Sequence, residues 1–472
     1  MAAPAGQDRP ESGEDFALEY ARFAASIDPA RLPTEVIIAA KVNLLDTLAC
    51  AAAGVTAEGV APVIDMVRDW GGKPEATLWG TDLKVPAHHA ALANGMMAHA
   101  RDYDDTHDAA VLHAGVSVIP AAIAAAELDP HASGADLIAG IVAGLELISR
   151  LGVATQIGII ESGYMYTALF GNFAAAAAAA RVLRMDAEQT ANTLGIVYSQ
   201  AAGTHQVTRD AALTKRLQPG FAAKAALLSV ALSRLGIRGA RRVFEGQDGL
   251  FHSYLRGRYD AAVLREGLGS RFEFLQLSYK PYPCCRFNHT GIDAALALRA
   301  QGLGAIRSIS VGVNRQAYEA VCTPPDMRKA PANVVQAQFS LPFTIACALA
   351  KGRVGLADFT AEGLADPEVR RLAAMVETRC DEAIERDWSR AVSPAQLDLE
   401  TAAGPRSIRV DVPKGHPSMP LGTEEIRAKL LDCLGTGEFA DPIGVADRLG
   451  AIVAGLEQAP SGASVVEPLS LP

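Results

Sequence analysis

The chain has 472 residues; half of them are hydrophobic, a fifth are charged and 6% are aromatic. This composition excludes intrinsic disorder, collagen-like repeats and small disulfide scaffolds. The 43 basic and 53 acidic side chains give a net charge of −10, and no basic run is interleaved with aromatic residues, so we expect neither nucleic acid nor a membrane as a partner.

The chain begins with a segment that we expect to be a disordered tail, residues 1–14. It is rich in Ala, Pro, Gly and Glu and contains no apolar stretch of signal-peptide length. Farther along, the seven cysteines are scattered, odd in number and without the spacings that bind zinc. Cysteines used in this way are typical of a reducing compartment, so we expect a cytoplasmic protein.

Residues 33–250 have the periodicity of helices. A proline in the first turn and a glycine at the end delimit the first long helix, over 33–54. Ser133 and Asp136 are spaced as in a capping box and predict the start of another long helix. Polar residues interrupt the apolar runs of both helices, so we expect core helices rather than membrane spans. The alanine run at 174–180 lets neighbours approach closely, which places its helix at the centre of the fold.

The pattern changes after about residue 270. Apolar and polar residues alternate at 309–313 and at 408–412, which predicts two half-buried strands. Helical periods are also present, at 292–299, 334–350, 365–378, 424–434 and 442–456, the last with Asp441 as its cap.

These patterns predict a mainly α fold in two parts. The larger part is an all-helical domain formed by both chain ends, residues 15–270 and 415–460. The smaller part is an inserted α+β domain, residues 271–414. After residue 460 we expect an unfolded tail.

The densest group of ionisable side chains lies at residues 99–113, which we call the acidic loop. It contains four aspartates and three histidines: Asp102, Asp104, Asp105, Asp108, His99, His107 and His113. Because apolar runs bracket this loop, we expect it to be held against the core, where pKa values are easily shifted. A solvated surface turn is one alternative. A metal site is another, although no other segment offers a matching ligand cluster.

Two further polar clusters lie later in the chain. Lys215 and Arg216 precede a predicted helix over 219–235. They either belong to a functional site or form the exposed start of that helix. Between Lys280 and His289, two prolines stiffen the backbone around a pair of cysteines. These cysteines are either small buried hydrophobic residues or, as a further alternative, a thiol nucleophile with His289 as its base.

The chain resembles the MmgE/PrpD family, which contains 2-methylcitrate dehydratase, cis-aconitate decarboxylase and iminodisuccinate epimerase. The similar strings follow the family's order, at 99–107, 118–120, 212–220, 244–246, 280–289, 338–343 and 415–421. The resemblance implies an all-helical domain and an α+β lid domain, an active site between them, and a homodimer. It also implies that no metal or other cofactor is used.

Carried over by position, the resemblance implies four catalytic residues, Asp102, His113, Lys215 and Lys280. It implies that further residues bind the substrate: Tyr103, Thr106, Met165, His205, Arg216, Cys285, Arg286 and His289. This chain departs from the family at several positions. Met165, Cys285 and Gln218 stand where family members often have histidine, and Ala114-Gly115 replaces the usual Pro-Ser; His205 is the candidate to compensate for one of the lost histidines.

The family's reactions share one step, in which negative charge develops on a carbon next to a carboxyl or carbonyl group. Lys215 and Lys280 can stabilise that charge in a closed cleft. His113, oriented by Asp102, is the best candidate for the base, and Asp102 itself is the alternative. Because the whole chain is acidic, we expect the site to be a local basic pocket.

The leading hypothesis is a cofactor-independent hydro-lyase, a dehydratase acting on a small hydroxylated di- or tricarboxylate. An isomerase or epimerase and a decarboxylase on a related acid are the alternatives within the family's chemistry. A catalytically inactive carboxylate-binding protein is the alternative of another class, and the lost histidines motivate it.

Overall fold

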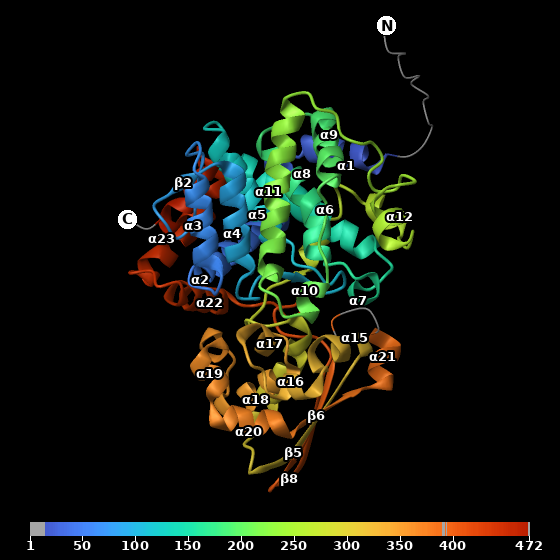
Figure 1. The fold of residues 1–472 in the computed structure, drawn as a ribbon, viewed down its shortest axis with the longest axis vertical. Helices are drawn as coiled ribbons and strands as arrows, with labels where there is room; N and C mark the ends of the chain where they lie inside the picture. The colour runs from blue at the N-terminus through green and yellow to red at the C-terminus, as the bar shows by residue number, and fades with distance from the viewer. Residues whose placement is uncertain (1–14, 389–391, 393, 471–472) are drawn as a thin grey trace.

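The computed structural model describes residues 15–388, 392 and 394–470. The predicted disordered tail, residues 1–14, lies outside the described residues. Helices dominate and the strands form small sheets, so the predicted mainly α fold with an α+β part is confirmed. In Figure 1 a large helical body lies above a smaller body that carries a four-stranded sheet.

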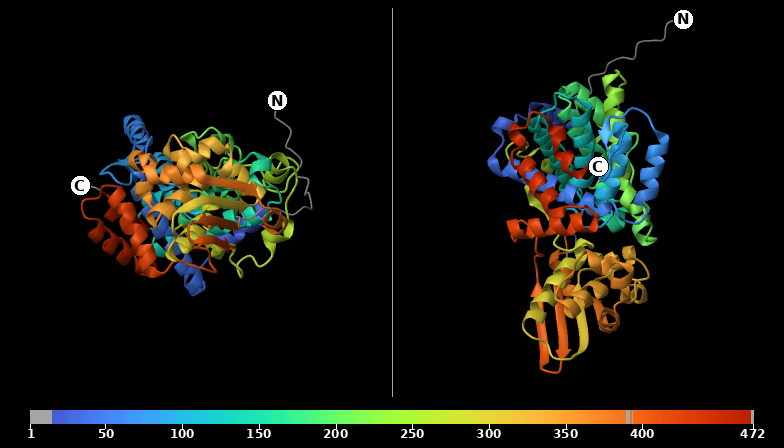
Figure 2. Two further views of the ribbon diagram at one scale, coloured as in Figure 1. Left: turned by 90° about the horizontal axis from the view of Figure 1, so that it is seen from below. Right: turned by 90° about the vertical axis from the view of Figure 1, so that its left-hand side faces the viewer.

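The helices of the large body come from both halves of the chain. The N-terminal half supplies α1 (Phe16–Ser26), α2 (Thr34–Gly54), α3 (Val60–Trp70), α4 (Ala87–His99), α5 (Gly115–Leu128), α6 (Gly134–Ala154), α7 (Ile159–Ser162), α8 (Tyr166–Val182), α9 (Ala187–Tyr198), α10 (Gln206–Arg209), α11 (Thr214–Arg234), α12 (Leu250–Leu255) and α13 (Ala261–Arg265). The C-terminal end adds α22 (Thr423–Thr436), α23 (Pro442–Ala454) and the 3-10 helix η7 (Gly462–Leu469). Figure 2 shows the red C-terminal helices packed on the body that the N-terminal half forms.

Helix α8 lies at the centre of the large body, as the alanine run predicts. Every residue of α8 is buried, and the helix packs against α5, α6, α9 and α11. Small side chains permit this close approach. The predicted capping box is also confirmed: at the start of α6 the Ser133 hydroxyl accepts from the Asp136 N–H, and the Asp136 carboxylate accepts from the Ser133 N–H.

Among the described residues, α2 and α6 are long and apolar enough to cross a membrane. In the fold, 67% of the apolar window of α2 and 94% of that of α6 are buried. Both helices contribute to the hydrophobic core of the large body, where their apolar surface is removed from water. They are core helices, as predicted.

The segment after residue 460 is folded, so the prediction of an unfolded tail is wrong. Val465, Val466 and Leu469 are buried in the core of the large body. The Gly80 N–H donates to the Leu469 carbonyl at 2.9 Å, which fixes the end of the segment. Burial of these apolar side chains outweighs the turn-forming glycine and proline on which the prediction relied.

The smaller body has its own core, which begins at Tyr282. Its sheet has the order β6-β5-β7-β8, with β5 and β6 parallel and the other neighbours antiparallel. The strands are β5 (Ile306–Val313), β6 (Val376–Cys380), β7 (Ala395–Thr401) and β8 (Gly404–Val410). The helices are α14 (His289–Ala300), α15 (Arg315–Ala317), α16 (Pro325–Lys329), α17 (Val334–Gln338), α18 (Leu341–Lys351), α19 (Ala361–Ala365), α20 (Pro367–Met375) and α21 (Glu382–Trp388).

Two of these strands were not predicted. The helix predicted over 365–378 ends at Met375, because Val376 adopts extended backbone and begins β6. In β7 the buried residues Ala395, Leu397 and Leu399 alternate with less buried ones, which is a period-two signal that could have revealed this strand.

Two short ladders interrupt the helical body, which is therefore not purely helical. β1 (Ala76–Thr77) pairs with β2 (Lys84–Val85), and β3 (Thr106–His107) pairs with β4 (Leu277–Ser278). Leu277 of β4 belongs to the core of the large body. The second ladder thus joins the acidic loop to the segment that enters the smaller body, and this junction positions the site.

Candidate active site

A cavity of about 60 Å³ lies where the two bodies meet. The large body supplies most of its lining: Asp102, Thr106, His107, Val111, Leu112, His113, Ile159, Met165, Thr167, His205, Thr208 and Lys215. The other side is lined by Cys285, Arg286, Phe287, Ala320, Phe339 and Val392. Ligand sites usually measure about 300–1,000 Å³. The cavity is therefore small for a ligand site.

The backbone of the acidic loop is unusual at two positions that line the cavity. Asp102 and Val111 both have φ of 53°, in the left-handed region. This region is costly for a residue with a Cβ, and most of all for a β-branched one such as Val111. Because of the turn at Asp102, its carboxylate points in a different direction from those of the aspartates that follow.

The end of the loop explains why Gly115 stands where the family usually has serine. The Asp105 carboxylate accepts from the Ala114 and Gly115 N–H groups, both at 3.0 Å, and this caps α5. A Cβ at Gly115 would lie 2.4 Å from Thr47 Oγ1, so there is no space for a side chain. Burial, with the neighbouring Asp104 charge, raises the pKa of Asp105 to about 6.

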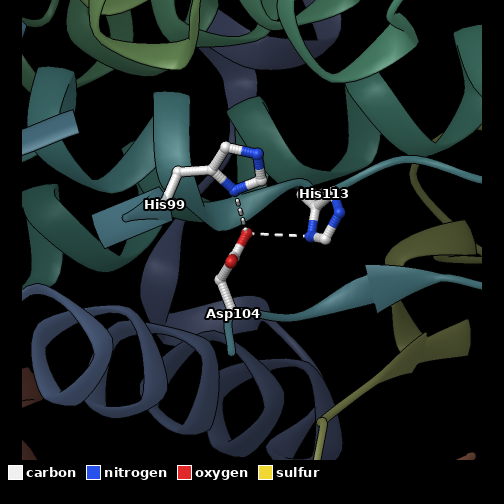
Figure 3. A group of neighbouring side chains, drawn as sticks. All are labelled: His99, Asp104 and His113. Atoms are coloured by element: carbon white, nitrogen blue, oxygen red, sulfur yellow. Dashed lines mark hydrogen bonds and ion pairs between the residues drawn. The ribbon is translucent and has the colours of Figure 1, made fainter. Parts of the chain in front are cut away.

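His99, Asp104 and His113 form a cluster beside the cavity (Figure 3). Asp104 Oδ2 lies 2.9 Å from His99 Nδ1 and 2.8 Å from His113 Nδ1. The contact with His99 is a hydrogen bond in which the carboxylate accepts, so His99 carries its proton on Nδ1 and its Nε2 is free of a proton while the ring is neutral. The contact with His113 has the distance of an ion pair but not the geometry of a hydrogen bond. The expectation that Asp102 orients His113 is wrong, because Asp104 is the carboxylate in contact.

The His99 ring stays neutral near pH 7. Burial lowers the pKa of His99 to about 4, although the Asp104 charge opposes the shift. Its Nε2 lies 3.0 Å from Lys215 Nζ and accepts from that ammonium group. Burial would raise the pKa of Asp104, but the two histidines that it contacts hold that pKa well below its usual range.

Asp102 lies between two lysines. Its Oδ2 accepts from Lys215 Nζ at 2.7 Å and its Oδ1 accepts from Lys280 Nζ at 2.5 Å. Burial would raise the pKa of Asp102, but the two ammonium groups outweigh burial and hold that pKa well below its usual range. An aspartate that resists protonation so strongly is a poor base, so the arrangement does not favour Asp102 in that role.

The two lysines differ in their access to the cavity. Lys280 is fully buried, does not line the cavity, and donates also to the Asp102 carbonyl at 2.9 Å. It holds Asp102 in position instead of facing a substrate as expected. Lys215, in the first turn of α11, does line the cavity. Among the described residues, His99 and Asp102 accept two of its three N–H groups, which leaves one for a substrate oxygen.

Of the predicted substrate-binding residues, five line the cavity: Thr106, Met165, His205, Cys285 and Arg286. The other three point elsewhere. The Tyr103 hydroxyl donates to the Pro281 carbonyl, and Arg216 Nη1 donates to the Glu58 carbonyl. His289 is buried, with Nε2 3.3 Å from the Cys284 carbonyl oxygen. Lys215 and Arg216 diverge because successive residues of a helix point about 100° apart.

The cations of the site are already paired with anions, which corrects the expectation of a basic pocket. Arg286 donates to both Asp108 oxygens, with Nε 3.0 Å from Oδ1 and Nη2 2.9 Å from Oδ2. Lys215 and Lys280 share Asp102. With Asp104 and Asp105 included, three cations face four carboxylates while the histidines are neutral. The site is therefore not a basic pocket, and proton uptake by an imidazole makes it less negative.

Thiol chemistry is not supported by this arrangement. Burial raises the pKa of Cys285 to about 11 and that of Cys284 well above its usual value. His289 approaches the Cys284 carbonyl and not a sulfur atom. A thiolate is the reactive form of cysteine, so these residues are unsuited to act as nucleophiles near neutral pH.

His99, Asp104 and His113 are also the described residues that could hold a metal ion, since their ligand atoms lie within 4.8 Å of one another. Asp104 Oδ2 already lies 2.9 Å from His99 Nδ1 and 2.8 Å from His113 Nδ1. The Lys215 ammonium group, 3.0 Å from His99 Nε2, would repel a cation placed there. The arrangement favours a proton relay over a metal centre.

Sequence reasoning missed several residues of the site. Asp104 and His99 were recognised only as members of a cluster, and nothing in the spacing distinguished them from their neighbours. The Thr167 hydroxyl accepts from the His113 N–H at 3.0 Å, and the Phe339 ring lies 5.0 Å from Lys215 Nζ. Phe339 belongs to the string at 338–343, which is the signal that could have identified it.

Comparisons with known proteins agree with this architecture. The MmgE/PrpD N-terminal domain matches residues 19–261, and the MmgE/PrpD C-terminal domain matches residues 282–440. The cis-aconitate decarboxylase-like protein oryM of Aspergillus oryzae is 27% identical over 87% of this chain and 89% of its own length. The cis-aconitate decarboxylases of Aspergillus terreus and Homo sapiens are each 26% identical, over 86% and 87% of this chain and 85% and 86% of theirs.

Proposed function

Since the chain belongs to the MmgE/PrpD family, we propose that it is a cofactor-independent lyase that acts on a small hydroxylated di- or tricarboxylate by proton transfer next to a carboxyl group. Relatives that cover most of the chain are enzymes. Dehydration is the first candidate reaction. Decarboxylation is the second, because the relatives named above are cis-aconitate decarboxylases or similar to them.

The observation that carries this proposal is the contact between His113 and Asp104. His113 Nδ1 lies 2.8 Å from Asp104 Oδ2, and the ring lines the cavity with 14% of its side chain exposed. With Nδ1 facing the Asp104 carboxylate, Nε2 is the ring atom that can accept a proton from a substrate. A carboxylate at this distance stabilises the imidazolium that forms.

Lys215 supplies the complementary charge. When a carbon next to a carboxylate loses its proton, the electron pair spreads onto the carboxylate oxygens. The remaining N–H of Lys215 can donate to one of these oxygens in a cavity that excludes water. The positive charge that His113 gains compensates the negative charge that the substrate gains, in surroundings whose other ions are paired.

The candidate reactions use the same arrangement of His113 and Lys215 but differ in the bonds that break. In dehydration, the imidazolium returns its proton to the hydroxyl group on the neighbouring carbon, the C–O bond breaks, and water leaves. In decarboxylation no proton is abstracted: His113 starts as the imidazolium, the C–C bond to a carboxylate breaks, its electron pair stays on the remaining carbon as carbon dioxide leaves, and the imidazolium protonates that carbon. In epimerisation, the proton returns to the same carbon on its other face.

The test is a panel of small polycarboxylates incubated with the protein in deuterated water and followed by NMR. We expect deuterium at the carbon next to a carboxyl group, together with an unsaturated product for dehydration or loss of a carboxyl carbon for decarboxylation. A protein that only binds carboxylates gives no label with any compound. Binding without label would therefore favour the inactive carboxylate-binding alternative and contradict a lyase.

We also propose a homodimer, as the family resemblance implies. Helix α11 exposes Phe221 and Leu228, and Leu235 caps its C-terminal end, with 49%, 43% and 79% of each residue accessible. They are spaced by seven residues and so lie near one face of the helix. Light scattering should give twice the chain mass, and Leu235→Asp should shift the protein toward the monomer; a monomeric wild-type protein would contradict the proposal.

A further inference from the structure

A second space adjoins the reaction cavity and has no role in the proton transfer just described. It measures about 280 Å³ and lies on the same boundary between the two bodies. Val111 and Ile159 line both spaces, so the two spaces adjoin at these residues. We call this second space the side pocket. A substituent on a substrate held at Lys215 would reach it past Val111 and Ile159.

The walls of the side pocket disfavour a second carboxylate. Among the described lining residues there is no lysine, arginine or histidine, and Asp260 is the one carboxylate. Its Oδ1 accepts from the Ala262 N–H at 2.9 Å. The Tyr166 hydroxyl is also engaged, because it donates to the Ile157 carbonyl at 2.6 Å. An anionic group would meet a negative charge and no cation, whereas an uncharged group would meet aliphatic side chains.

One polar group of the side pocket lacks a partner. Gln316, in α15 of the smaller body, is only 9% exposed, and its Nε2 makes no hydrogen bond to the described residues. Helices α7 and α15 face each other across the boundary in Figure 1, and a Cβ at Gly158, just before α7, would lie 3.1 Å from Gln316 Oε1. A buried amide donor without an acceptor is unfavourable, so an acceptor on a ligand would satisfy it.

We propose that the side pocket binds an uncharged arm of the substrate, and that Gln316 donates a hydrogen bond to a carbonyl or ether oxygen on that arm. This inference rests on the proposed function, since it takes the carboxylate end of the substrate to lie at Lys215. It makes Gln316 and the aliphatic walls the residues that select the substrate. The substrate class becomes a hydroxylated carboxylate with one uncharged branch, as opposed to a tricarboxylate.

The experiment compares four probes that differ only in the branch on carbon 2 of malate: hydrogen (malate), propyl, 2-oxopropyl and carboxymethyl (citrate). Calorimetric titration gives Kd for the wild type, for Val153→Phe, which fills the side pocket, and for Gln316→Leu, which removes the donor and keeps the shape. Val153 lines the side pocket and not the reaction cavity. Val263→Phe, at another position of the same wall, is the second filling variant.

We expect the wild type to bind the 2-oxopropyl probe about tenfold more tightly than malate or citrate, because several buried groups each add to affinity. Val153→Phe and Val263→Phe should remove this gain and leave the Kd of malate within about twofold, since they leave the site at Lys215 unchanged. Gln316→Leu should reduce the affinity for the 2-oxopropyl probe to that for the propyl probe.

Three results would overturn the proposal. Equal affinity of the wild type for malate and the 2-oxopropyl probe would show that the arm is not bound. Equal weakening of all probes by Val153→Phe would make the side pocket an entrance. In both cases malate that still exchanges deuterium in a His113-dependent way would leave the proposed function intact. If no probe binds or exchanges, both proposals fall.

Discussion

The two walls of the reaction cavity differ in the side chains that they present. On the side of the acidic loop, Asp104 contacts two histidines and Asp102 contacts two lysines. On the opposite side, Ala320, Phe339 and Val392 present apolar surface. Under the proposed function, the large body arranges the proton transfer and the smaller body excludes water from it.

The largest effect should come from removing the groups that act on the substrate. His113→Ala and Lys215→Ala should each reduce turnover by a factor on the order of a hundred or more, because one removes the base and the other the charge partner. Steady-state rates with the best compound of the panel measure this effect. His131→Ala, at an exposed histidine of the same body, is the matched control. Near-normal rates in both variants would remove these roles.

The next effect tests whether His99 is excluded from water in the folded chain, as its burial implies. The pKa of His99, about 4 because of burial, is below the ordinary value of about 6.5. The unfolded chain then binds more protons below pH 6.5, so the stabilisation is present above that pH and is lost as the pH falls toward 4. Between pH 7.5 and 5 this amounts to about 2 kcal/mol, or about 30-fold in the unfolding equilibrium.

Urea unfolding of the wild type and of His99→Gln at both pH values measures this loss. The wild type should lose about 2 kcal/mol more than the variant. Subtracting the loss of the variant from that of the wild type also removes the contributions of two other groups. The pKa of Asp105 is raised to about 6, which acts in the opposite direction, and the pKa of His205 is lowered to about 4 by burial. Equal losses in the two proteins would mean that His99 is hydrated in the folded chain.

A smaller effect distinguishes the roles of Asp104 and Asp108, two of the four aspartates of the acidic loop. Asp104→Asn keeps the shape but removes the charge that stabilises the His113 imidazolium, so kcat should fall about tenfold with little change in KM. The pH profile of kcat should shift to lower pH, because the imidazolium loses its anionic partner. Asp108→Asn, which weakens the pairing with Arg286, is the comparison variant. An unchanged pH profile in Asp104→Asn would contradict the orienting role.

The smallest effect concerns the apolar wall. Phe339→Leu removes a ring that lies 5.0 Å from Lys215 Nζ, and the lost interaction should weaken carboxylate binding about two- to fivefold. Phe343→Leu, in the core of the smaller body against Phe359, is matched in chemistry but distant from the cavity in its contacts. If both substitutions change KM equally, the wall contributes only to the folding of the smaller body.

The fold was largely predictable because its signals are periodic and local. The buried alanine helix, the cap at Ser133 and the cap at Asp441, which accepts from the Gly444 N–H, all depend on neighbours in sequence. The strand β6 was not predictable in the same way. The helical period continues past Met375, and pairing with β5 determines that Val376 leaves the helix.

The site was predictable as a set of segments and not as a set of contacts. Asp102 and Asp104 are two residues apart in one loop, and the positive φ of Asp102 determines which carboxylate faces the lysines and which faces the histidines. No spacing rule expresses such a turn. In the same way, Lys280 carries the expected charge, but its complete burial under Asp102 is a property of the packed structure.

The buried position of η7 has a consequence for synthesis of the chain on the ribosome. The smaller body is built from one continuous stretch, so all of its parts have emerged before α22, α23 and η7 are made. The large body, in contrast, exposes part of its core until Val465, Val466 and Leu469 arrive. The segment that is translated second can therefore complete its fold first, and the nascent first half needs protection from aggregation until translation is almost finished.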